Sequence, residues 1–395
     1  MKIVQINTTC GTGSTGKICV AIGRLLTARG VENYILYSQG ASADPSGIRY
    51  ASGGYKKIQA LKSRIFANGG FNSRRATRRL IRELERIAPD AVHLHNIHGH
   101  DCHLSMLFRY LKRKKIKLYW TFHDCWAFTA NCPHFSFVGC EQWKTECRRC
   151  PQIRQTSWFF DRSKTLYARK KKLFGGLDLT VITPSQWLAD LVKESFLKDY
   201  PVQVIYNGID LQVFRPTESD FRERYRVPES KFILLGVAFD WGQRKGLDVF
   251  VELANRLDRE KFQLVLVGTD SAIDKQFPNH VICIHRTNDQ QELAKLYTAA
   301  DLFVNPTREE VLGMVNIEAN ACGTPVLTFR TGGSPECIDE FSGSVVECDD
   351  IDAMEREIIR ICENRAYSTE ACLRNTARFD KDERFGEYLK LYGVN

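Results

Sequence analysis

Short runs of β-branched and aromatic residues alternate with longer amphipathic stretches along the whole chain, a pattern typical of strands connected by helices. Such alternation predicts parallel sheets with helices on both faces. Because a chain of 395 residues is too long for one hydrophobic core, we expect two such domains. The strand candidates are residues 2–7, 33–37, 91–95, 117–123, 179–184 and 202–206 in the first half, and 232–238, 262–267, 281–285, 302–305, 325–329 and 344–347 in the second.

A change in charge and the loop at residues 207–216 place the domain boundary near residues 198–215. We therefore expect a Rossmann-like N-terminal domain at residues 1–200 and a Rossmann-like C-terminal domain at residues 201–372. The tail at 373–395 is expected to form a helix, from about residue 371 to 391, that can pack on either domain, and so back on the N-terminal one.

The positive charge is concentrated in the first half of the chain. Residues 1–198 contain 33 Lys and Arg against 13 Asp and Glu, a formal charge of about +20, whereas residues 199–395 contain 23 against 34, about −11. Three basic clusters lie at residues 74–86, 112–117 and 169–172. Such clusters attract phospholipid, pyrophosphate or nucleic acid, but the simpler explanation of any single cluster is a solvated helix face.

The composition excludes several classes of protein. With 43% hydrophobic and 26% charged residues, the chain is neither disordered nor of low complexity. Apolar runs such as 232–237 are about six residues long, whereas a membrane-spanning helix needs about 20. The first residues begin a strand and lack the features of a secretory signal, so we expect a cytosolic protein whose cysteines are mostly reduced.

A glycine-rich loop at residues 11–17 follows the first predicted strand. Its spacing fits both a phosphate-binding loop and a dinucleotide-binding loop. The first requires Ser or Thr after Lys17, where Ile18 stands, and the second requires an acid at the end of the next strand, where the sequence reads Tyr-Ser-Gln. Gly13 therefore marks either a tight turn or a loop whose helix amides meet an anion or a sugar hydroxyl.

Asp350 and Asp352 match the D-x-D pattern that can hold a divalent metal. They lie between the last predicted strand and a helix expected near Met354, where carboxylates cap the helix and interact favourably with its dipole. We interpret them as capping residues.

The most specific pattern is TREEVLGMVNIEANACGTPV at residues 307–326. It places Glu310 and Glu318 eight residues apart, across the junction of a loop and a helix. Gly313 allows the backbone to approach a ligand closely, and the amides at the start of the helix are available to a phosphate. From the residues alone, Glu318 is equally well explained as a helix residue paired with a nearby lysine.

This pattern resembles the E-x7-E signature of glycosyltransferase family four, which has the α/β GT-B fold of two facing, doubly wound Rossmann-like domains with a cleft between them. Segments 89–96, 121–124, 204–216, 244–246 and 331–336 match the family in the same order, and the resemblance covers about residues 1–390. The HDCWAFT segment and the cysteines that follow it are similar to the branch that builds capsule, colanic-acid and other exopolysaccharides.

The resemblance implies roles for particular residues. Glu318 would bind the ribose hydroxyls, Glu310 the donor sugar, and Lys245 the diphosphate. The family usually has an Arg where Phe239 stands, and Arg244 is the candidate to replace its charge. The further expected donor-binding residues are Gly13, Gly242, Arg286, Leu312, Gly313, Met314 and Val315.

Two residues of the N-terminal domain complete the expected catalytic set. The resemblance implies that His123, at the end of a strand, faces the donor sugar, but a histidine there is equally well explained as a packed structural residue. Asp124 is a candidate base or orienting group.

The resemblance implies retention of the anomeric configuration, with no protein nucleophile and no cofactor for catalysis. Without a metal site, cations and backbone amides must stabilise the departing diphosphate. The expected donor is a UDP- or GDP-sugar, the expected acceptor a lipid-linked saccharide, and the expected location the inner face of the cytoplasmic membrane, approached through the basic N-terminal domain. The alternatives are a sugar-nucleotide epimerase or hydrolase on the same fold, and a nucleic-acid-binding protein, which would leave Glu310 and Glu318 unexplained.

Four of the fourteen cysteines, Cys132, Cys140, Cys147 and Cys150, lie within nineteen residues. Four thiolates can bind zinc tetrahedrally, and a structural zinc ion would hold this long loop together. Because only one C-x-x-C pair is present, two disulfides or free thiols are the alternatives.

Overall fold

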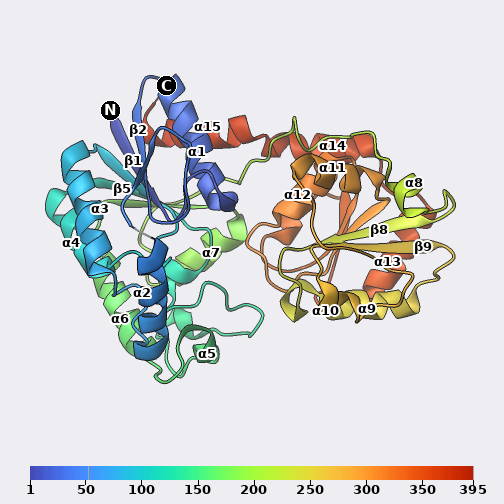
Figure 1. The fold of residues 1–395 in the computed structure, drawn as a ribbon, viewed down its shortest axis with the longest axis horizontal. Coiled ribbons are helices and arrows are strands. Elements are labelled where there is room, and N and C mark those ends of the chain that lie inside the picture. Colours follow the sequence, from blue (N-terminus) through green and yellow to red (C-terminus); the bar gives the residue numbers. More distant parts are fainter. Residues whose placement is uncertain (52, 395) are drawn as a thin grey trace. The chain divides into compact units, whose positions relative to one another are not determined.

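The computed structural model describes residues 1–51 and 53–394, which divide into two compact units. The first unit comprises Met1–Ile205 and Phe385–Asn395, and the second comprises Tyr206–Arg384; Asn395, the last residue of the expected tail, lies outside the described residues. Each unit is built on a parallel sheet flanked by helices (Figure 1). The predicted α/β class with two Rossmann-like domains is therefore confirmed.

The first unit contains, within the described residues, a seven-stranded sheet in the order β3-β2-β1-β4-β5-β6-β7. Its strands are β1 (Lys2–Asn7), β2 (Glu32–Tyr37), β3 (Gly47–Arg49), β4 (Ala91–Leu94), β5 (Lys117–Thr121), β6 (Leu179–Thr183) and β7 (Val202–Val204). Its helices are α1 (Gly13–Ala28), α2 (Gly53–Phe66), α3 (Arg74–Ile87), α4 (Leu104–Lys114), η1 (Trp126–Phe128), η2 (Gln142–Lys144), α5 (Ile153–Thr156), α6 (Ser163–Phe174), α7 (Gln186–Glu194) and most of α15 (Lys381–Tyr392).

The second unit has a six-stranded sheet in the order β10-β9-β8-β11-β12-β13. Its strands are β8 (Phe232–Val237), β9 (Phe262–Val267), β10 (Ile282–Ile284), β11 (Leu302–Asn305), β12 (Val326–Phe329) and β13 (Gly343–Val346). Its helices are α8 (Phe221–Tyr225), η3 (Gln243–Lys245), α9 (Leu247–Arg256), α10 (Ser271–Asp274), α11 (Gln290–Ala299), α12 (Met314–Ala321), η4 (Ser334–Cys337), α13 (Ile351–Glu363), α14 (Thr369–Thr376) and η5 (Ala377–Phe379).

Strand β1 lies inside the first sheet, between β2 and β4, and nearly all of its side chains are buried there. Polar Gln5 and Asn7 are tolerated there since each finds a partner. The Gln5 amide donates to the carbonyl of Cys19 at 2.9 Å, and the Asn7 amide donates to the carbonyl of Thr9 at 2.8 Å. Buried polar groups that keep their hydrogen bonds cost little, and Asn7 is the last residue of the strand.

The prediction of one helix at about residues 371–391 is wrong in one respect, because the structure has two α-helices there. Helix α14 ends before η5, and α15 begins after Asp380. The break occurs because Ile209 takes up the backbone hydrogen bonds: its amide donates to the carbonyl of Phe379 at 2.9 Å, and its carbonyl accepts from the amide of Lys381 at 3.0 Å. The Asp380 carboxylate then accepts from the amide of Asp382 at 2.8 Å, at the start of the new helix.

Helix α15 packs against the core of the first unit. Its apolar positions contact buried residues of β1, α1, β5 and β6, and four of its side chains belong to that core: Phe385, Tyr388, Leu389 and Tyr392. Every helix in the described part of the chain is too short or too polar to cross a membrane.

Candidate functional site

Lys245 and Glu310 form an ion pair at the carboxyl edge of the second sheet. Lys245 ends the short helix η3 after β8, and Glu310 lies in the loop after β11. These two strands are neighbours in the sheet, so residues 65 positions apart meet, with Nζ 2.7 Å from Oε2. The side chains are only 20% and 23% exposed, and the other carboxylate oxygen of Glu310 accepts from the amide of Val311 at 3.1 Å.

Arg308 fixes these two loops relative to one another, although sequence reasoning did not identify it. Its guanidinium binds both carboxylate oxygens of Asp248 at 2.7 Å, one oxygen of Asp349 at 2.6 Å, and the carbonyl of Gln243. Its backbone amide donates to the carbonyl of Arg244 at 2.9 Å. The bonds to Asp248 outweigh burial and raise the pKa of Arg308, so the charge is permanent.

Two glycines allow the backbones around the pair to touch. Gly332 has φ +54°, and a Cβ atom there would lie 1.7 Å from the carbonyl oxygen of Glu310. The next amide, of Gly333, donates to that oxygen at 3.2 Å. Gly246 has φ +73°, and a Cβ atom there would lie 2.3 Å from the carbonyl oxygen of Pro306. These loops therefore require glycine at both positions.

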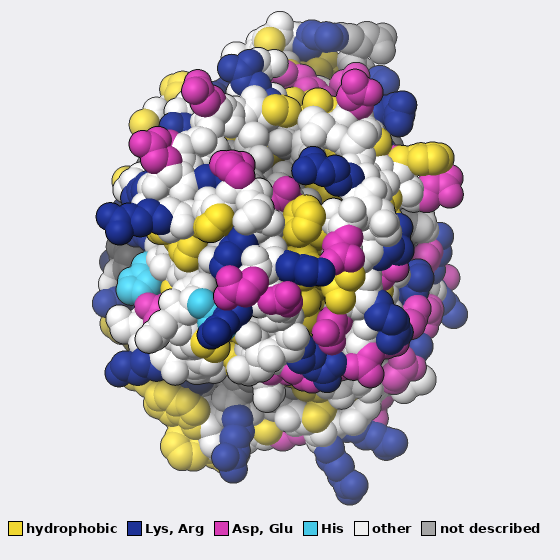
Figure 2. Space-filling model, turned by 90° about the vertical axis from the view of Figure 1, so that its right-hand side faces the viewer, with side chains coloured by type: hydrophobic (Ala, Val, Ile, Leu, Met, Phe, Trp, Pro, Cys, Tyr) yellow, Lys and Arg dark blue, Asp and Glu magenta, His cyan; other side chains and the backbone are white. Residues whose placement is uncertain are grey.

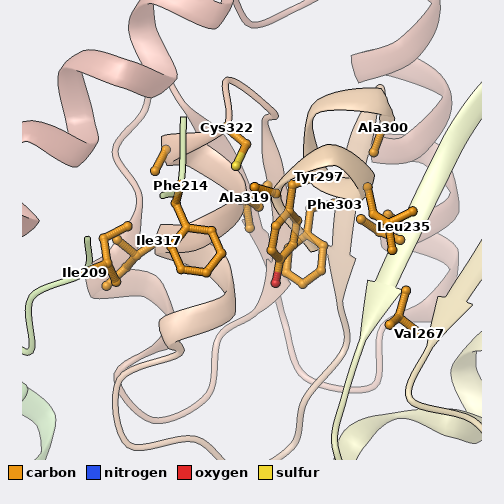
Figure 3. Packing of buried hydrophobic residues seen from close by; sticks show 14 of the residues in the cluster. Ile209, Phe214, Leu235, Val267, Tyr297, Ala300, Phe303, Ile317, Ala319 and Cys322 are labelled. Carbon is orange, nitrogen blue, oxygen red and sulfur yellow. The ribbon is translucent and has the colours of Figure 1, made fainter. Parts of the chain in front are cut away.

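Helix α12 begins directly after Gly313, which has φ +76° and acts as its N-cap. In the second turn, Glu318 accepts a hydrogen bond from the hydroxyl of Tyr297 at 3.2 Å. Burial, reinforced by the Glu318 charge, raises the pKa of Tyr297 well above its usual value, so this hydroxyl remains a donor. Figure 3 shows Tyr297 beside Phe303 and Ala319 in the core beneath this helix.

The other predicted donor-binding residues of the second unit occupy the same loops or neighbouring ones. Gly242 precedes η3, the half-buried Arg244 lies beside Lys245, and the exposed Arg286 follows β10. Phe239, at the position where the family has an arginine, is fully exposed. The buried Leu312 and the half-buried Met314 and Val315 flank Gly313.

The capping interpretation of the D-x-D pattern is confirmed. The Asp350 carboxylate accepts from the amide of Ala353 at 2.8 Å at the start of α13, and Asp352 forms an ion pair with Arg256 at 2.5 Å.

Three histidines line the ends of β4 and β5 in the first unit. Nδ1 of His95 lies 3.2 Å from Nε2 of His123, and the two rings are stacked. Behind them, His93 contacts the hydroxyls of Thr121 at 2.8 Å and Tyr392 at 2.5 Å. Burial lowers the pKa of His93 to about 3 and that of His123 to about 4, and it lowers the pKa of His95 well below its usual value. All three rings are therefore neutral at pH 7.

The hydrogen bonds of Gln5 determine which ring nitrogens carry protons. Its amide nitrogen donates to the carbonyl of Cys19, so its oxygen, 3.2 Å from Nε2 of His95, accepts the proton of that nitrogen. Nδ1 of His95 is then an acceptor, and Nε2 of His123 donates a hydrogen bond to it. Nδ1 of His123 is thereby left as a hydrogen-bond acceptor, a detail that only the folded arrangement reveals.

Asp124 lies beside His98 and Trp126. Its carboxylate is 3.2 Å from Nε2 of His98 and accepts from the amide of Trp126 at 2.8 Å. Burial opposes its ionisation, but His98 and these hydrogen bonds lower the pKa of Asp124 below its ordinary value. The His98 ring stacks on Trp126, with centroids 4.9 Å apart.

The buried Lys170 packs against Trp126 and holds the segment that follows Asp124. Its ammonium donates to the carbonyls of Trp126 at 2.6 Å and Thr129 at 3.2 Å, and lies 3.3 Å from the centre of the Trp126 ring system. The side chain is completely buried, whereas Lys171 and Lys172 are exposed. The interpretation of the basic cluster 169–172 as a solvated helix face therefore holds for only part of that cluster.

The glycine loop opens α1 as predicted. Gly13 has φ +67°, and no atom lies within 4 Å of the position of a Cβ atom there. The amide of Gly11 donates to the carbonyl of Gly16 at 3.0 Å, which closes the turn. The loop follows β1, whose neighbour β4 leads to His95.

The predicted zinc site receives no support from the geometry. Cys132, Cys140, Cys147 and Cys150 line a common cavity of about 30 Å³, but the described residues contain no group of three or more side chains placed to hold a metal. Burial raises the pKa of Cys132 to about 12 and that of Cys147 to about 11, which stabilises the neutral thiols. All fourteen cysteines, each among the described residues, are free, so the disulfide alternative is not adopted either.

Comparison with protein families gives matches to both halves of the chain. The family model described as Glycosyltransferase Family 4 matches residues 16–213, and the model described as Glycosyl transferases group 1 matches residues 218–380.

Individual proteins match over the whole length. A putative colanic acid biosynthesis glycosyl transferase, WcaC of Escherichia coli, is 22% identical, with 99% of each chain covered. Among solved structures, sucrose-phosphate synthase of Thermosynechococcus elongatus superposes with a TM-score of 0.73 at 20% identity, covering 99% of this chain and 98% of that one. HepE of Anabaena, in complex with UDP-glucose, superposes with a TM-score of 0.69 at 16% identity, covering all of both chains.

Proposed function

Because the chain belongs to glycosyltransferase family 4, we propose that it transfers a sugar from a nucleoside diphosphate to a saccharide acceptor, with retention of configuration and without a catalytic metal. The observation that carries this proposal is the half-buried ion pair of Lys245 and Glu310 at the carboxyl edge of the second sheet, beside the start of α12. Open α/β sheets bind ligands at this edge, where neighbouring strands connect in opposite directions.

In the proposed complex, the second unit holds the nucleotide. Glu318 accepts hydrogen bonds from the ribose hydroxyls, and the buried Tyr297 hydroxyl holds the carboxylate in place. Arg286, exposed after β10, lies near the base. A UDP- or GDP-sugar fits this arrangement, and support for UDP comes from the structurally similar HepE, which was solved with UDP-glucose.

The diphosphate binds Lys245, Arg244 and the first amides of α12. Without a donor, Glu310 neutralises Lys245 at 2.7 Å. When the diphosphate arrives, Lys245 is shared with it, and Glu310 turns to the hydroxyls of the sugar. Each charge-assisted hydrogen bond in such a site contributes about 1.5–3 kcal/mol.

In the transfer step, the bond between the anomeric carbon and the diphosphate oxygen breaks while the acceptor oxygen bonds to the same face of that carbon. The electron pair of the broken bond goes to the diphosphate, which takes the proton of the acceptor hydroxyl. Arg244 and Lys245 stabilise the charge that develops on the leaving oxygen. His123 contacts the donor sugar through its accepting Nδ1 atom, and Asp124 orients the acceptor.

We further propose a lipid-linked saccharide as the acceptor, in the assembly of a bacterial surface polysaccharide on the inner face of the cytoplasmic membrane. Support comes from the E. coli relative, which is described as a colanic acid enzyme. WaaG, described as a glycosyltransferase of lipopolysaccharide biosynthesis, also superposes, with a TM-score of 0.65. The excess of basic residues in the first half favours an anionic surface.

The test is nucleotide binding measured by thermal shift, followed by transfer assays. UDP or GDP should raise the melting temperature of the wild type, because a ligand that binds only the folded state stabilises it. Lys245→Met should weaken that binding by about 10- to 150-fold, the equivalent of one charge-assisted contact. The matched control is Lys261→Met, which removes an exposed Lys–Glu pair with Glu363 at 2.8 Å and should leave binding unchanged.

Product analysis distinguishes transfer from other reactions of a sugar nucleotide. Release of the nucleoside diphosphate only when a saccharide acceptor is present, with the sugar found bonded to that acceptor, supports the proposal. Release of free sugar, or isomerisation of the donor, without an acceptor would refute it, as would full binding of both nucleotides by a folded Lys245→Met protein.

A further inference from the structure

Helix α2 is amphipathic, but it exposes apolar residues and buries polar ones, the opposite of a helix packed on a protein core. It exposes the apolar residues Ile58 and Leu61, at 55% and 48%, and buries the polar residues Gln59 and Ser63, at 7% and 2%. The buried side is held by hydrogen bonds, for example one of 3.1 Å between Nδ1 of His100 and the hydroxyl of Ser63. The helix is therefore attached through polar contacts, and its apolar face is turned outward.

A second exposed apolar segment adjoins the end of this helix. Trp158, Phe159 and Phe160 follow α5 and are 54%, 69% and 50% exposed. The amide of Trp158 donates to the carbonyl of Arg64 at 2.8 Å, and the Arg64 guanidinium lies 6.0 Å from the Trp158 ring system. The two segments are thus joined at Arg64.

These segments contain half of the twelve large apolar side chains that are exposed among the described residues. Apolar residues scattered singly on a surface are ordinary, but a concentration of this kind marks a binding surface. We call these six residues the docking surface: Ile58, Leu61, Phe66, Trp158, Phe159 and Phe160.

Basic residues surround the docking surface. From residue 45 to residue 82 the sequence has ten Lys and Arg and no acidic residue, and the exposed Lys57, Lys62 and Arg64 lie on α2 itself. The Arg162 guanidinium lies 5.8 Å from the Phe160 ring. The carboxylate of the nearby Asp161 accepts hydrogen bonds from the backbone amides of Cys150 at 2.7 Å and Ser163 at 2.8 Å. By contrast, the face of the second unit in Figure 2 has acidic and basic side chains interspersed.

We propose that the docking surface binds the anionic surface of a phospholipid bilayer, with its aromatic side chains inserted at the level of the headgroups. The inference rests on the proposed function, since a lipid-linked acceptor lies in such a bilayer. Tryptophan and phenylalanine are favoured at this depth, and lysine and arginine around them pair with lipid phosphates. A second copy of this chain fits less well, because two such basic surfaces would repel one another.

The experiment is flotation of the full chain with vesicles of phosphatidylcholine alone or with one third phosphatidylglycerol. The wild type should float with the anionic vesicles and lose most of that binding at high salt. The double variant Phe159→Ser/Phe160→Ser should bind at least tenfold more weakly. Its matched control is Phe341→Ser, which removes an exposed phenylalanine, 57% accessible, from the second unit and should bind as the wild type does.

A charge variant tests the basic rim separately. Lys62→Gln should weaken binding to anionic vesicles by several-fold, whereas Lys275→Gln, an exposed lysine of the second unit, should have no effect. Because all these side chains are exposed, each variant should keep the melting temperature and the nucleotide-induced shift of the wild type.

Two results would overturn the proposal. One is equal flotation of the wild type and the Phe159→Ser/Phe160→Ser variant, or no flotation of either. The other is a dimer by light scattering that this variant converts to a monomer, which would assign the docking surface to a second copy. Vesicle binding without any nucleotide effect would instead refute the proposed function and leave the docking surface standing.

Discussion

The buried Lys170 should make the stability of the first unit depend on pH in a way that one substitution removes. Burial lowers the pKa of Lys170 to about 7, although Cys132, Asp124 and Cys147 act in the opposite direction. In the unfolded chain a lysine has a pKa of about 10.4. Between these two values the unfolded state binds one more proton than the folded state, so this group makes the free energy of unfolding rise with pH.

The size of the effect follows from the pKa difference. A full pH unit inside the window contributes up to about 1.4 kcal/mol, so raising the pH from about 7.0 to 8.5 should add about 1.5–2 kcal/mol. Buried thiols with raised pKa values, such as Cys132 and Cys147, lower the stability over the same range, since they lose protons first in the unfolded chain. We therefore compare the change in the free energy of unfolding between the two pH values, which we call the pH response, in the wild type and the variant. The contribution of the thiols is the same in both proteins and disappears from the difference.

The assay is urea unfolding at both pH values, followed by tryptophan fluorescence, because five of the six tryptophans lie in the first unit. Lys170→Met should show a pH response smaller than that of the wild type by about 1.5–2 kcal/mol. Lys171→Met, on the same helix and exposed, should respond as the wild type does. If Lys170→Met and the wild type respond alike, Lys170 is charged in the folded state throughout this range and the argument from burial fails.

Two further predictions concern the site loops and the histidines. Gly332→Ala should lower the melting temperature and abolish nucleotide stabilisation, because a Cβ atom would meet the Glu310 carbonyl. Its control is Gly176→Ala, where φ is +69° and the space for a Cβ atom is open, so that the substitution should lower the free energy of unfolding in urea by only about 1–2 kcal/mol. Equal effects of the two substitutions would contradict the steric argument. His93 and His123, whose pKa values burial lowers to about 3 and about 4, should together remove about 3 kcal/mol of stability as the pH falls from about 6.5 to 5.0, since only the unfolded chain takes up their protons. Unchanged urea unfolding between these pH values would show that the rings are not buried as neutral groups.

The sequence predicts the strands well because their signal is local. All twelve predicted strands are present, with ends that differ by at most two residues. The strand β3 (Gly47–Arg49) was missed because its sequence, Gly-Ile-Arg, has a single β-branched residue, whereas the equally short β7 (Val202–Val204) and β10 (Ile282–Ile284) each have two. The break between α14 and α15 was missed for a different reason: it depends on Ile209, some 170 positions earlier in the chain, which no local pattern can reveal.

The sequence points to candidate functional residues but not to the residues that hold them in place. Lys245 and Glu310 lie in recognisable segments, and the structure brings them together. Arg308 lies inside the same segment, but only the fold shows that its charge is directed at Asp248 and away from the pair. Likewise, Lys170 has the sequence context of a surface lysine and is completely buried. Supporting residues act through tertiary contacts, and those contacts are what a single sequence lacks.

The strand order explains why the candidate residues of each unit gather at one place on its sheet. In the first sheet the chain turns back between β1 and β4, and in the second between β8 and β11. Loops that follow such a pair of strands diverge to opposite faces and leave a crevice at the carboxyl edge. The Gly13 loop and His95 flank the first of these positions, and Lys245 and Glu310 the second. The same topology therefore places one candidate region in each unit, and the difference in chemistry, neutral histidines in one and a charged pair in the other, comes from the loops alone.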